Sequence, residues 1–156
     1  MKDIKLIAYD FDGVMTDNHV YVDENGKESV KVNRGDGLGV GLIKKLGIEQ
    51  VIISTEVNNV VEMRAKKLDI PVIHGVKDKR IILIKYCEER GIELKDAMFI
   101  GNDLNDLEAI EAAGVGGAPA DAEPEILKAA RWISAKKGGD GVIRELARVL
   151  FELRSM

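Results

Sequence analysis

The sequence has one cysteine, three prolines and few aromatic residues. A single cysteine cannot form a disulfide within the chain, which is typical of a reducing compartment. Cys87 lies in an apolar run, where a buried thiol is expected rather than a nucleophile. No segment approaches the roughly 20 consecutive apolar residues of a membrane helix, and the N-terminus has no signal-peptide pattern. These absences predict a cytoplasmic protein without a membrane partner.

The sequence also lacks an excess of positive charge. Its 23 Lys and Arg and 27 Asp and Glu give a net charge of −4, whereas nucleic acid binding requires a basic face. Nucleic acid is therefore not an expected partner. An acidic protein still binds an anionic phosphate where a metal ion and local cations reverse the field. With no repeat, low-complexity tract or linker, the chain is predicted to form a single domain, residues 1–156.

The sequence does contain a regular alternation of short apolar runs and amphipathic segments. Strands are predicted at 4–9, 51–54, 71–73, 97–100, 115–118 and 132–133. Helices are predicted at 36–45, 57–68, 78–90, 103–113, 123–130 and 142–153, with Asp36 as the N-cap of the first. Strands that alternate with helices imply parallel pairing and right-handed crossovers. The expected fold class is α/β, a three-layer α/β/α Rossmann-like sandwich.

One segment interrupts this alternation directly after the first strand. Residues 19–22 and 29–32 alternate polar and apolar side chains around Asn25-Gly26, a strong hairpin signal. An isolated two-stranded hairpin is only marginally stable in water, so its apolar face needs a partner surface. That face is Val20, Val22, Val30 and Val32, or the alternate set with Tyr21. A second copy of the chain is the expected partner, and the alternative is a hairpin folded back on its own domain.

Polar side chains follow several predicted strands at their carboxyl ends, where ligands collect in such folds. They are Asp10 and Asp12 after the first strand, Ser54 after the second, and Asn102, Asp103 and Asp106 after strand 97–100. Each has an ordinary interpretation as a turn residue or helix cap, and Lys79 as a solvated lysine. Together, in this order and at these strand ends, they indicate a catalytic site.

The segment from Asp10 to Asp17, Asp-Phe-Asp-Gly-Val-Met-Thr-Asp, resembles the first motif of the haloacid dehalogenase superfamily, Asp-x-Asp-Gly-x-x-Thr-Asp. Ser54, Lys79 and Gly101-Asn102-Asp103-x-x-Asp106 fit its second, third and fourth motifs. No large insertion follows Asp17 or separates the second motif from the third, so no cap domain is expected. The resemblance is to the capless branch, which includes 3-deoxy-octulosonate 8-phosphate phosphatases and phosphatase-like modules of sialic acid biosynthesis.

This resemblance implies a Mg²⁺-dependent phosphatase and a role for each motif residue. Asp10 is the implied nucleophile, which forms an acyl phosphate. Asp12 is the implied acid and base, which protonates the leaving oxygen and then activates water. The implied Mg²⁺ ligands are Asp10, the carbonyl group of Asp12, and Asp103. The residues that contact the phosphate are Gly13, Ser54 and Lys79.

Two positions depart from the frequent pattern of this branch. Asn102 stands where the fourth motif often has Asp, which leaves Asp103 as the expected metal ligand. Ser54-Thr55-Glu56 replaces the Thr-Gly-Arg of the octulosonate 8-phosphate phosphatases, which favours a nine-carbon 2-keto-3-deoxy acid 9-phosphate. The eight-carbon 8-phosphate is the alternative substrate. The expected substrate-binding residues are Gly13, Thr55, Glu56, Arg64, Lys67 and Arg144.

A rival interpretation is a non-catalytic oligomerisation or regulatory module associated with a sialic acid cytidylyltransferase. The intact acids and Lys79 favour an enzyme, because a scaffold needs none of them. The resembling capless phosphatases are tetramers in which neighbours help to close each site, so a homotetramer is expected. The hairpin reaches across an interface in this interpretation. Segment 138–144 either reaches an adjacent site as well or is a flexible loop before the last helix.

Overall fold

The computed structural model describes residues 1–156 and is built on a sheet of six parallel strands. The strands are β1 (Leu6–Tyr9), β4 (Glu49–Ile53), β5 (Val72–Ile73), β6 (Ala97–Ile100), β7 (Val115–Ala118) and β8 (Trp132–Ile133). Their order is β5-β4-β1-β6-β7-β8, so β1 pairs with β4 on one side and β6 on the other. The direction of winding changes at β1, and the ligand crevice of such a sheet lies at the carboxyl end of that strand.

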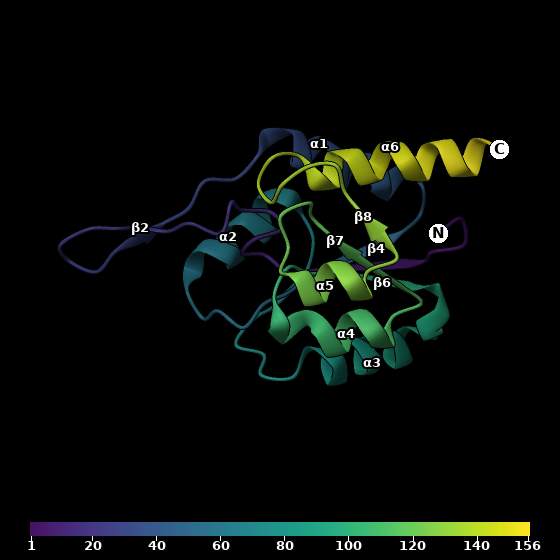
Figure 1. Ribbon diagram of the computed structural model, residues 1–156, viewed down its shortest axis with the longest axis horizontal. Helices are drawn as coiled ribbons and strands as arrows, with labels where there is room; N and C mark the ends of the chain where they lie inside the picture. The colour runs from purple at the N-terminus through teal and green to yellow at the C-terminus, as the bar shows by residue number, and fades with distance from the viewer.

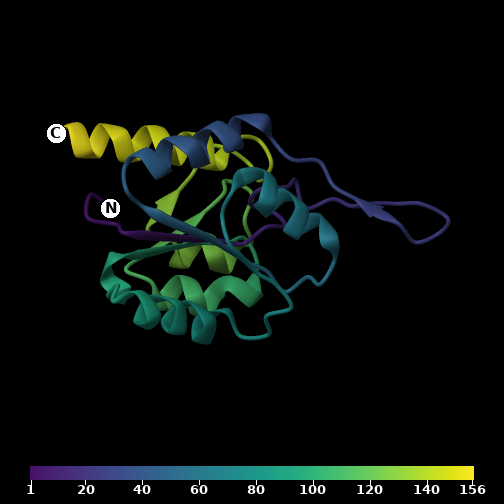
Figure 2. The ribbon, with the colours of Figure 1, turned by 180° about the vertical axis from the view of Figure 1, so that it is seen from behind.

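Helices cover both faces of the sheet (Figures 1 and 2). One layer is α1 (Arg34–Lys45), α2 (Asn59–Leu68) and α6 (Val142–Ser155); the other is α3 (Lys79–Arg90), α4 (Leu107–Ala112) and α5 (Pro124–Ala129). Two short 3₁₀ turns, η1 (Leu94–Asp96) and η2 (Leu104–Asp106), flank β6. Within β1, Ile7 and Tyr9 face the first layer, and Leu6 and Ala8 face the second. Burial on both faces explains why the strand is apolar throughout, and the predicted three-layer fold without a cap is confirmed.

Helix boundaries differ from the prediction at Asp36. The N-cap of α1 is Asn33, whose side chain accepts a hydrogen bond from the Gly35 amide at 2.7 Å. Asp36 lies within α1, and its Oδ1 accepts from the amides of Ile143 and Arg144 at 3.1 Å each. The first turn of α6 has unpaired N–H groups, and its own N-cap position is a glycine without a capping side chain. Asp36 therefore caps a helix more than 100 residues away in the chain.

The environment of Asp36 makes stability depend on pH. Burial raises the pKa of its carboxyl group from 3.8 to about 6, against the two amide donors, and Oδ2 has no hydrogen-bond partner. The folded state therefore binds this proton more tightly than the unfolded state, and the contribution to stability is lost as pH rises from about 4 through 6. Between pH 4 and pH 7, ionisation of Asp36 should lower the unfolding free energy of the wild type by on the order of 2 kcal/mol. We expect Asp36→Asn, which keeps an Oδ1 acceptor, to lack this fall. Urea unfolding of both proteins at pH 4 and pH 7 measures it, and an equal change in unfolding free energy between the two pH values in both proteins would contradict it.

The predicted hairpin is present, with shorter strands than expected. β2 (Tyr21–Val22) pairs antiparallel with β3 (Glu28–Ser29), and an isolated bridge between Thr16 and Val32 closes its base. The hairpin projects from the end of the molecule opposite to both chain termini (Figures 1 and 2). Tyr21 and Val22 are 63% and 61% exposed. The tip of the hairpin therefore does not fold back on its own domain, whereas Val30 and Val32 at its base are partly buried against the domain's core. None of the helices is long and apolar enough to cross a membrane.

Candidate active site

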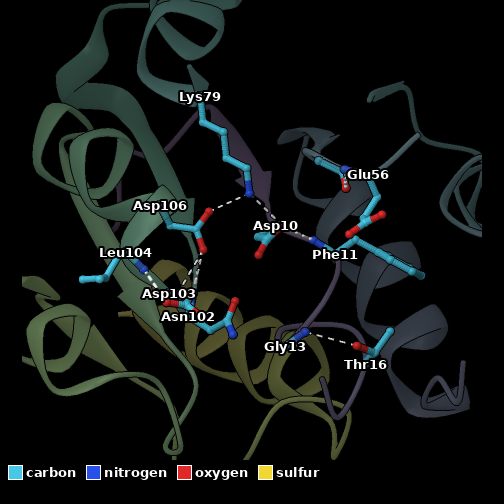
Figure 3. A network of polar contacts seen from close by, with 11 residues as sticks. Asp10, Phe11, Gly13, Thr16, Glu56, Lys79, Asn102, Asp103, Leu104 and Asp106 are labelled. Carbon is cyan, nitrogen blue, oxygen red and sulfur yellow. Dashed lines mark hydrogen bonds and ion pairs between the residues drawn. The ribbon is translucent and has the colours of Figure 1, made fainter. Parts of the chain in front are cut away.

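Three charged side chains meet below the carboxyl end of β1, all nearly inaccessible to solvent. The Lys79 ammonium group donates to Oδ1 of Asp10 at 2.8 Å and to Oδ1 of Asp106 at 2.7 Å (Figure 3). Asp10 is 6% exposed, Lys79 2% and Asp106 0%. The ordinary interpretation of Lys79 as a solvated lysine does not hold, because the first turn of α3 directs this side chain under the sheet edge. Asp78, the N-cap of α3, accepts from the Ile81 amide at 3.0 Å and fixes that turn.

Asp106 also organises the loop that follows β6. Its Oδ2 accepts from the amides of Asn102 at 2.9 Å and Asp103 at 3.3 Å. A Cβ atom on Gly101 would lie 2.4 Å from the Cβ of Asp106, so only glycine fits there. The sequence motif contains Asp106, but the motif alone assigned it no role. The structure shows that it holds Lys79 with one oxygen and the β6 loop with the other.

The charge of this group depends on the protonation of Asp10. Burial raises the pKa of Asp10 from 3.8 to about 8, the Asp106 carboxylate acts in the same direction, and the Lys79 ammonium opposes both. Burial alone would lower the pKa of Lys79, but the two carboxylates raise it above its ordinary value, so Lys79 is an ammonium group at neutral pH. With Asp10 protonated, Lys79 and Asp106 balance; with Asp10 ionised, one cation faces two carboxylates. A further cation at the open side of Asp10 would therefore favour its ionised form.

That open side carries a set of oxygen ligands. One terminal atom of the Asn102 amide lies 2.9 Å from the Asp12 carbonyl oxygen and 3.0 Å from Oδ2 of Asp10. With nitrogen in that place, Asn102 donates two hydrogen bonds; with oxygen there, three oxygens converge. Carboxylate, backbone carbonyl and amide oxygens are ligands that Mg²⁺ accepts. The residues therefore fit a Mg²⁺ ion, although no group of three or more His, Cys, Asp or Glu side chains surrounds a point.

The structure places Asn102 at the position expected for Asp103. Oδ1 of Asp103 accepts from the Leu104 amide at 2.7 Å, as the N-cap of η2. Asn102 directly follows Gly101 at the end of β6 and is 8% exposed. The sequence offered a signal that the interpretation missed: Asn102 stands closer to the strand end. The preference for a carboxylate over an amide pointed instead to Asp103.

This geometry predicts unequal effects of the two residues on metal binding. We expect Asn102→Ala to weaken Mg²⁺ binding by about tenfold or more, and Asp103→Ala to weaken it less, because only Asn102 contacts the Asp10 and Asp12 oxygens. Mg²⁺ titration followed by the rise in melting temperature measures both without requiring turnover. Asn102→Asp keeps an oxygen ligand at this position, now as a carboxylate, and should bind Mg²⁺ at least as tightly as the wild type. A larger loss in Asp103→Ala would return the ligand role to Asp103.

A polar cavity of about 160 Å³ opens above Asp10. Its lining residues are Asp10, Asp12, Asn18, Thr55, Glu56, Asn102, Asp103 and Asn105. Burial raises the pKa of Asp12, and the Glu56 charge raises it further, which favours a protonated acid that can donate to a leaving group. The lining contains four acids and no Lys or Arg. The cavity of one chain therefore lacks an exposed cation for an acidic substrate.

The remaining phosphate-contacting candidates also lie here. Gly13 has φ +84°, and a Cβ atom there would lie 2.0 Å from Nδ2 of Asn102, so only glycine allows this approach. Ser54 directly follows β4 and is buried, and its Oγ accepts from the Glu56 amide at 3.1 Å. Thr16, which the motif contained without an assigned role, accepts from the amides of Gly13 and Asn18 at 3.1 Å each. Thr16 thereby sets the turn that carries Asp12.

Three of the expected substrate-binding residues lie elsewhere. Arg64 and Lys67 line a separate cavity of about 640 Å³ between α1 and α2, which also contains Arg34 and Leu38. Although this cavity is larger, it does not contain Asp10. Arg144 is exposed in the first turn of α6. None of the three lines the polar cavity above Asp10 in its own chain.

Comparisons with known proteins identify the family of the chain. Residues 42–146 match the haloacid dehalogenase-like hydrolase family. The chain is 31% identical over 150 residues to 3-deoxy-D-manno-octulosonate 8-phosphate phosphatase of Escherichia coli K12, covering 96% of this chain and 80% of that protein. It is 27% identical over 153 residues to N-acylneuraminate cytidylyltransferase A of Danio rerio, covering 97% of this chain but only 36% of that protein.

Solved structures give the same result. The 3-deoxy-D-manno-octulosonate 8-phosphate phosphatase of Moraxella catarrhalis, solved with magnesium, phosphate and KDO, superposes with a TM-score of 0.95 and 34% identity. The match covers 99% of this chain and 89% of that one. The cobalt-bound deoxy-D-mannose-octulosonate 8-phosphate phosphatase of Haemophilus influenzae has a TM-score of 0.94 and 26% identity, covering 99% and 91%.

Proposed function

Because the chain belongs to the haloacid dehalogenase-like hydrolases and is a phosphoric monoester hydrolase, we propose that it hydrolyses the phosphate ester of a 3-deoxy-2-keto sugar acid. The observation that carries the proposal is the buried Asp10, held by Lys79 at 2.8 Å and facing a polar cavity beside Asp12. The substrate class is supported by the names of the relatives and by the sugar acid and phosphate in the Moraxella catarrhalis structure.

The proposed reaction has two steps. An oxygen of Asp10 attacks phosphorus, the bond from phosphorus to the sugar oxygen breaks, and Asp12 gives its proton to that oxygen. Water then attacks the phosphorus of the aspartyl phosphate and gives a proton to Asp12. The bond from phosphorus to the Asp10 oxygen breaks, so phosphate is released and the Asp10 carboxylate is restored. A Mg²⁺ ion held by Asp10, the Asp12 carbonyl and Asn102 would offset the repulsion between the anionic nucleophile and the phosphate. Lys79 keeps Asp10 oriented throughout.

The length of the sugar is the finer part of the proposal. The relatives support an eight-carbon 8-phosphate better than the nine-carbon 9-phosphate that the sequence favoured. Glu56 is the observation that keeps the nine-carbon acid as a second candidate, because it lines the catalytic cavity and can accept hydrogen bonds from hydroxyl or amide groups. Incubation with the eight-carbon 8-phosphate and with the nine-carbon 9-phosphate, each with Mg²⁺ present, tests the function by the phosphate released. Release of phosphate from neither ester would support the regulatory module instead.

Glu56 provides a direct test of that choice. If it contacts the sugar, Glu56→Arg should shift the ratio of kcat/KM towards the eight-carbon acid, because the charge beside the substrate is inverted. A change of about tenfold corresponds to 1.4 kcal/mol. Glu62→Arg, in the first turn of α2, is a matched control, since Glu62 does not line the cavity. An unchanged ratio in Glu56→Arg would show that Glu56 does not discriminate.

The proposal includes assembly into a homotetramer in which neighbours complete each site. The catalytic cavity has no cation for a substrate carboxylate, while Arg64, Lys67 and Arg144 lie outside it and serve as candidates from a neighbouring copy. The exposed Tyr21 and Val22 of the hairpin supply an apolar contact surface. Light scattering at micromolar concentration tests the assembly. Deletion of residues 21–29 tests the hairpin, because a fully active tetramer without it would show that it is dispensable.

A further inference from the structure

The loop that precedes α6 presses against the loop that carries the acid Asp12. The first, residues 134–141, is here named the C-terminal loop; the second, residues 12–17, is the acid loop. The Gly139 amide donates to the Val14 carbonyl oxygen at 3.1 Å. A Cβ atom on Gly138 would lie 2.0 Å from the Gly13 carbonyl oxygen, and one on Gly139 would lie 2.6 Å from the Asp17 amide nitrogen. The two backbones are therefore in contact at a distance that only glycine allows.

The C-terminal loop is itself fastened at several points. Oδ1 of Asp121, in the turn after β7, accepts from the Gly138 amide at 2.9 Å. In the same turn, the Ala120 amide donates to the Lys136 carbonyl oxygen at 2.9 Å. At the other end, the Glu145 carboxylate accepts from the Ala135 amide at 3.0 Å and from the Ser134 hydroxyl. Asp121 is the one side chain that accepts a hydrogen bond from the Gly138 amide, at the point where the two loops approach most closely. It thereby connects the C-terminal loop to the turn after β7.

From these contacts we propose that Asp121, Gly138 and Gly139 are positioning residues that fix Asp12 through the acid loop, an inference that rests on the proposed function. Asp10 does not depend on this contact, because its amide donates to the Ile100 carbonyl oxygen at 2.8 Å and its carboxylate is held by Lys79. Asp12 precedes Gly13, whose carbonyl oxygen meets Gly138. Movement of the C-terminal loop therefore displaces the acid and leaves the nucleophile in place.

The leaving group distinguishes this role from a general loss of structure. A sugar alkoxide leaves only when it is protonated, so its hydrolysis depends on the position of the Asp12 proton. A p-nitrophenolate ion leaves without protonation, so its release in the first step depends on Asp10 and barely on Asp12, whereas hydrolysis of the aspartyl phosphate uses Asp12 with either ester. In a single turnover, a variant with a displaced acid loop should therefore release the sugar more slowly and release p-nitrophenolate at the wild-type rate. Partial unfolding lowers both rates equally.

The experiment compares Asp121→Ala, which loses the acceptor, with Asp121→Asn, which keeps Oδ1. We expect Asp121→Ala and Gly138→Ala to lower the single-turnover rate of sugar release by about tenfold or more, with less than about a twofold change in the single-turnover release of p-nitrophenolate. Asp121→Asn should restore the wild-type ratio. Gly41→Ala is the matched glycine control, because a Cβ atom there meets nothing within 4 Å. Should Gly138→Ala fail to fold, the two Asp121 variants decide.

Two results with the variants, and one with the wild type, would overturn the inference. An Asp121→Ala protein with wild-type single-turnover rates on both esters would show that the contact positions nothing. Equal losses on both esters would assign the contact to stability alone. If the wild type releases phosphate from p-nitrophenyl phosphate but from no sugar-acid phosphate, the proposed substrate is refuted. The positioning role is then tested with an alkyl phosphate such as β-glycerophosphate in place of the sugar-acid phosphate. A wild type inactive on all of these esters would overturn both proposals.

Discussion

Asp10→Asn should abolish phosphate release and leave the fold intact. The amide is a poor nucleophile and cannot form the acyl phosphate, so the reaction loses its first step. The side chain keeps its shape, and its Oδ1 still accepts from Lys79 and from the Phe11 amide at the distances of 2.8 Å seen for the carboxylate. Turnover should fall at least about 10²-fold, which corresponds to about 2.7 kcal/mol of activation free energy. Phosphate release from the purified variant measures the loss.

The control for this variant is Asp69→Asn. Asp69 is the C-cap of α2, with a fully solvated side chain that pairs with Lys44. The same chemical change there should leave turnover unaltered. Beryllium fluoride with Mg²⁺ should bind wild-type Asp10 as a mimic of the phospho-aspartate and should not bind Asp10→Asn. Residual activity above about one per cent of wild type would argue against covalent catalysis by Asp10.

Lys79→Ala should lose both activity and stability. Without the ammonium group, Asp10 and Asp106 are left as buried carboxylates with no cation, and breaking such a buried pair costs about 3–5 kcal/mol. An exposed lysine would contribute far less to the free energy of unfolding, and the burial of Lys79 is the reason for the larger expected loss. Urea unfolding and phosphate release, measured on the same preparation, test the two effects.

Lys85→Ala provides the matched control in the same helix. Lys85 is solvent-exposed and reaches Glu89 only at 4.0 Å, so its removal should change the unfolding free energy by less than about 0.5 kcal/mol. Mg²⁺ should restore part of the stability of Lys79→Ala, because a divalent cation at Asp10 replaces some of the missing positive charge. A Lys79→Ala protein as stable as Lys85→Ala would show that the buried carboxylates do not need this partner.

Features that depend on neighbouring residues were readable from the sequence. The apolar run at β1, the Asn25-Gly26 turn of the hairpin and the alternation of strands and helices are local patterns, since each follows from backbone preferences and side-chain periodicity. Together they gave the three-layer fold. They also brought Asp10, Ser54 and Asn102 to one edge of the sheet, because parallel strands end on the same side.

Features that depend on distant segments were decided by the tertiary structure alone. Whether Lys79 is solvated depends on Asp10 and Asp106, and whether Asp36 caps its own helix depends on α6. The same limit applies to Asn102, which meets Asp10 because Asp106 fixes the loop that follows β6. A local pattern fixes which way a side chain points along its own element. Which partner it meets is decided only when elements far apart in the chain pack together and exclude water, because burial then makes an unpaired charge costly.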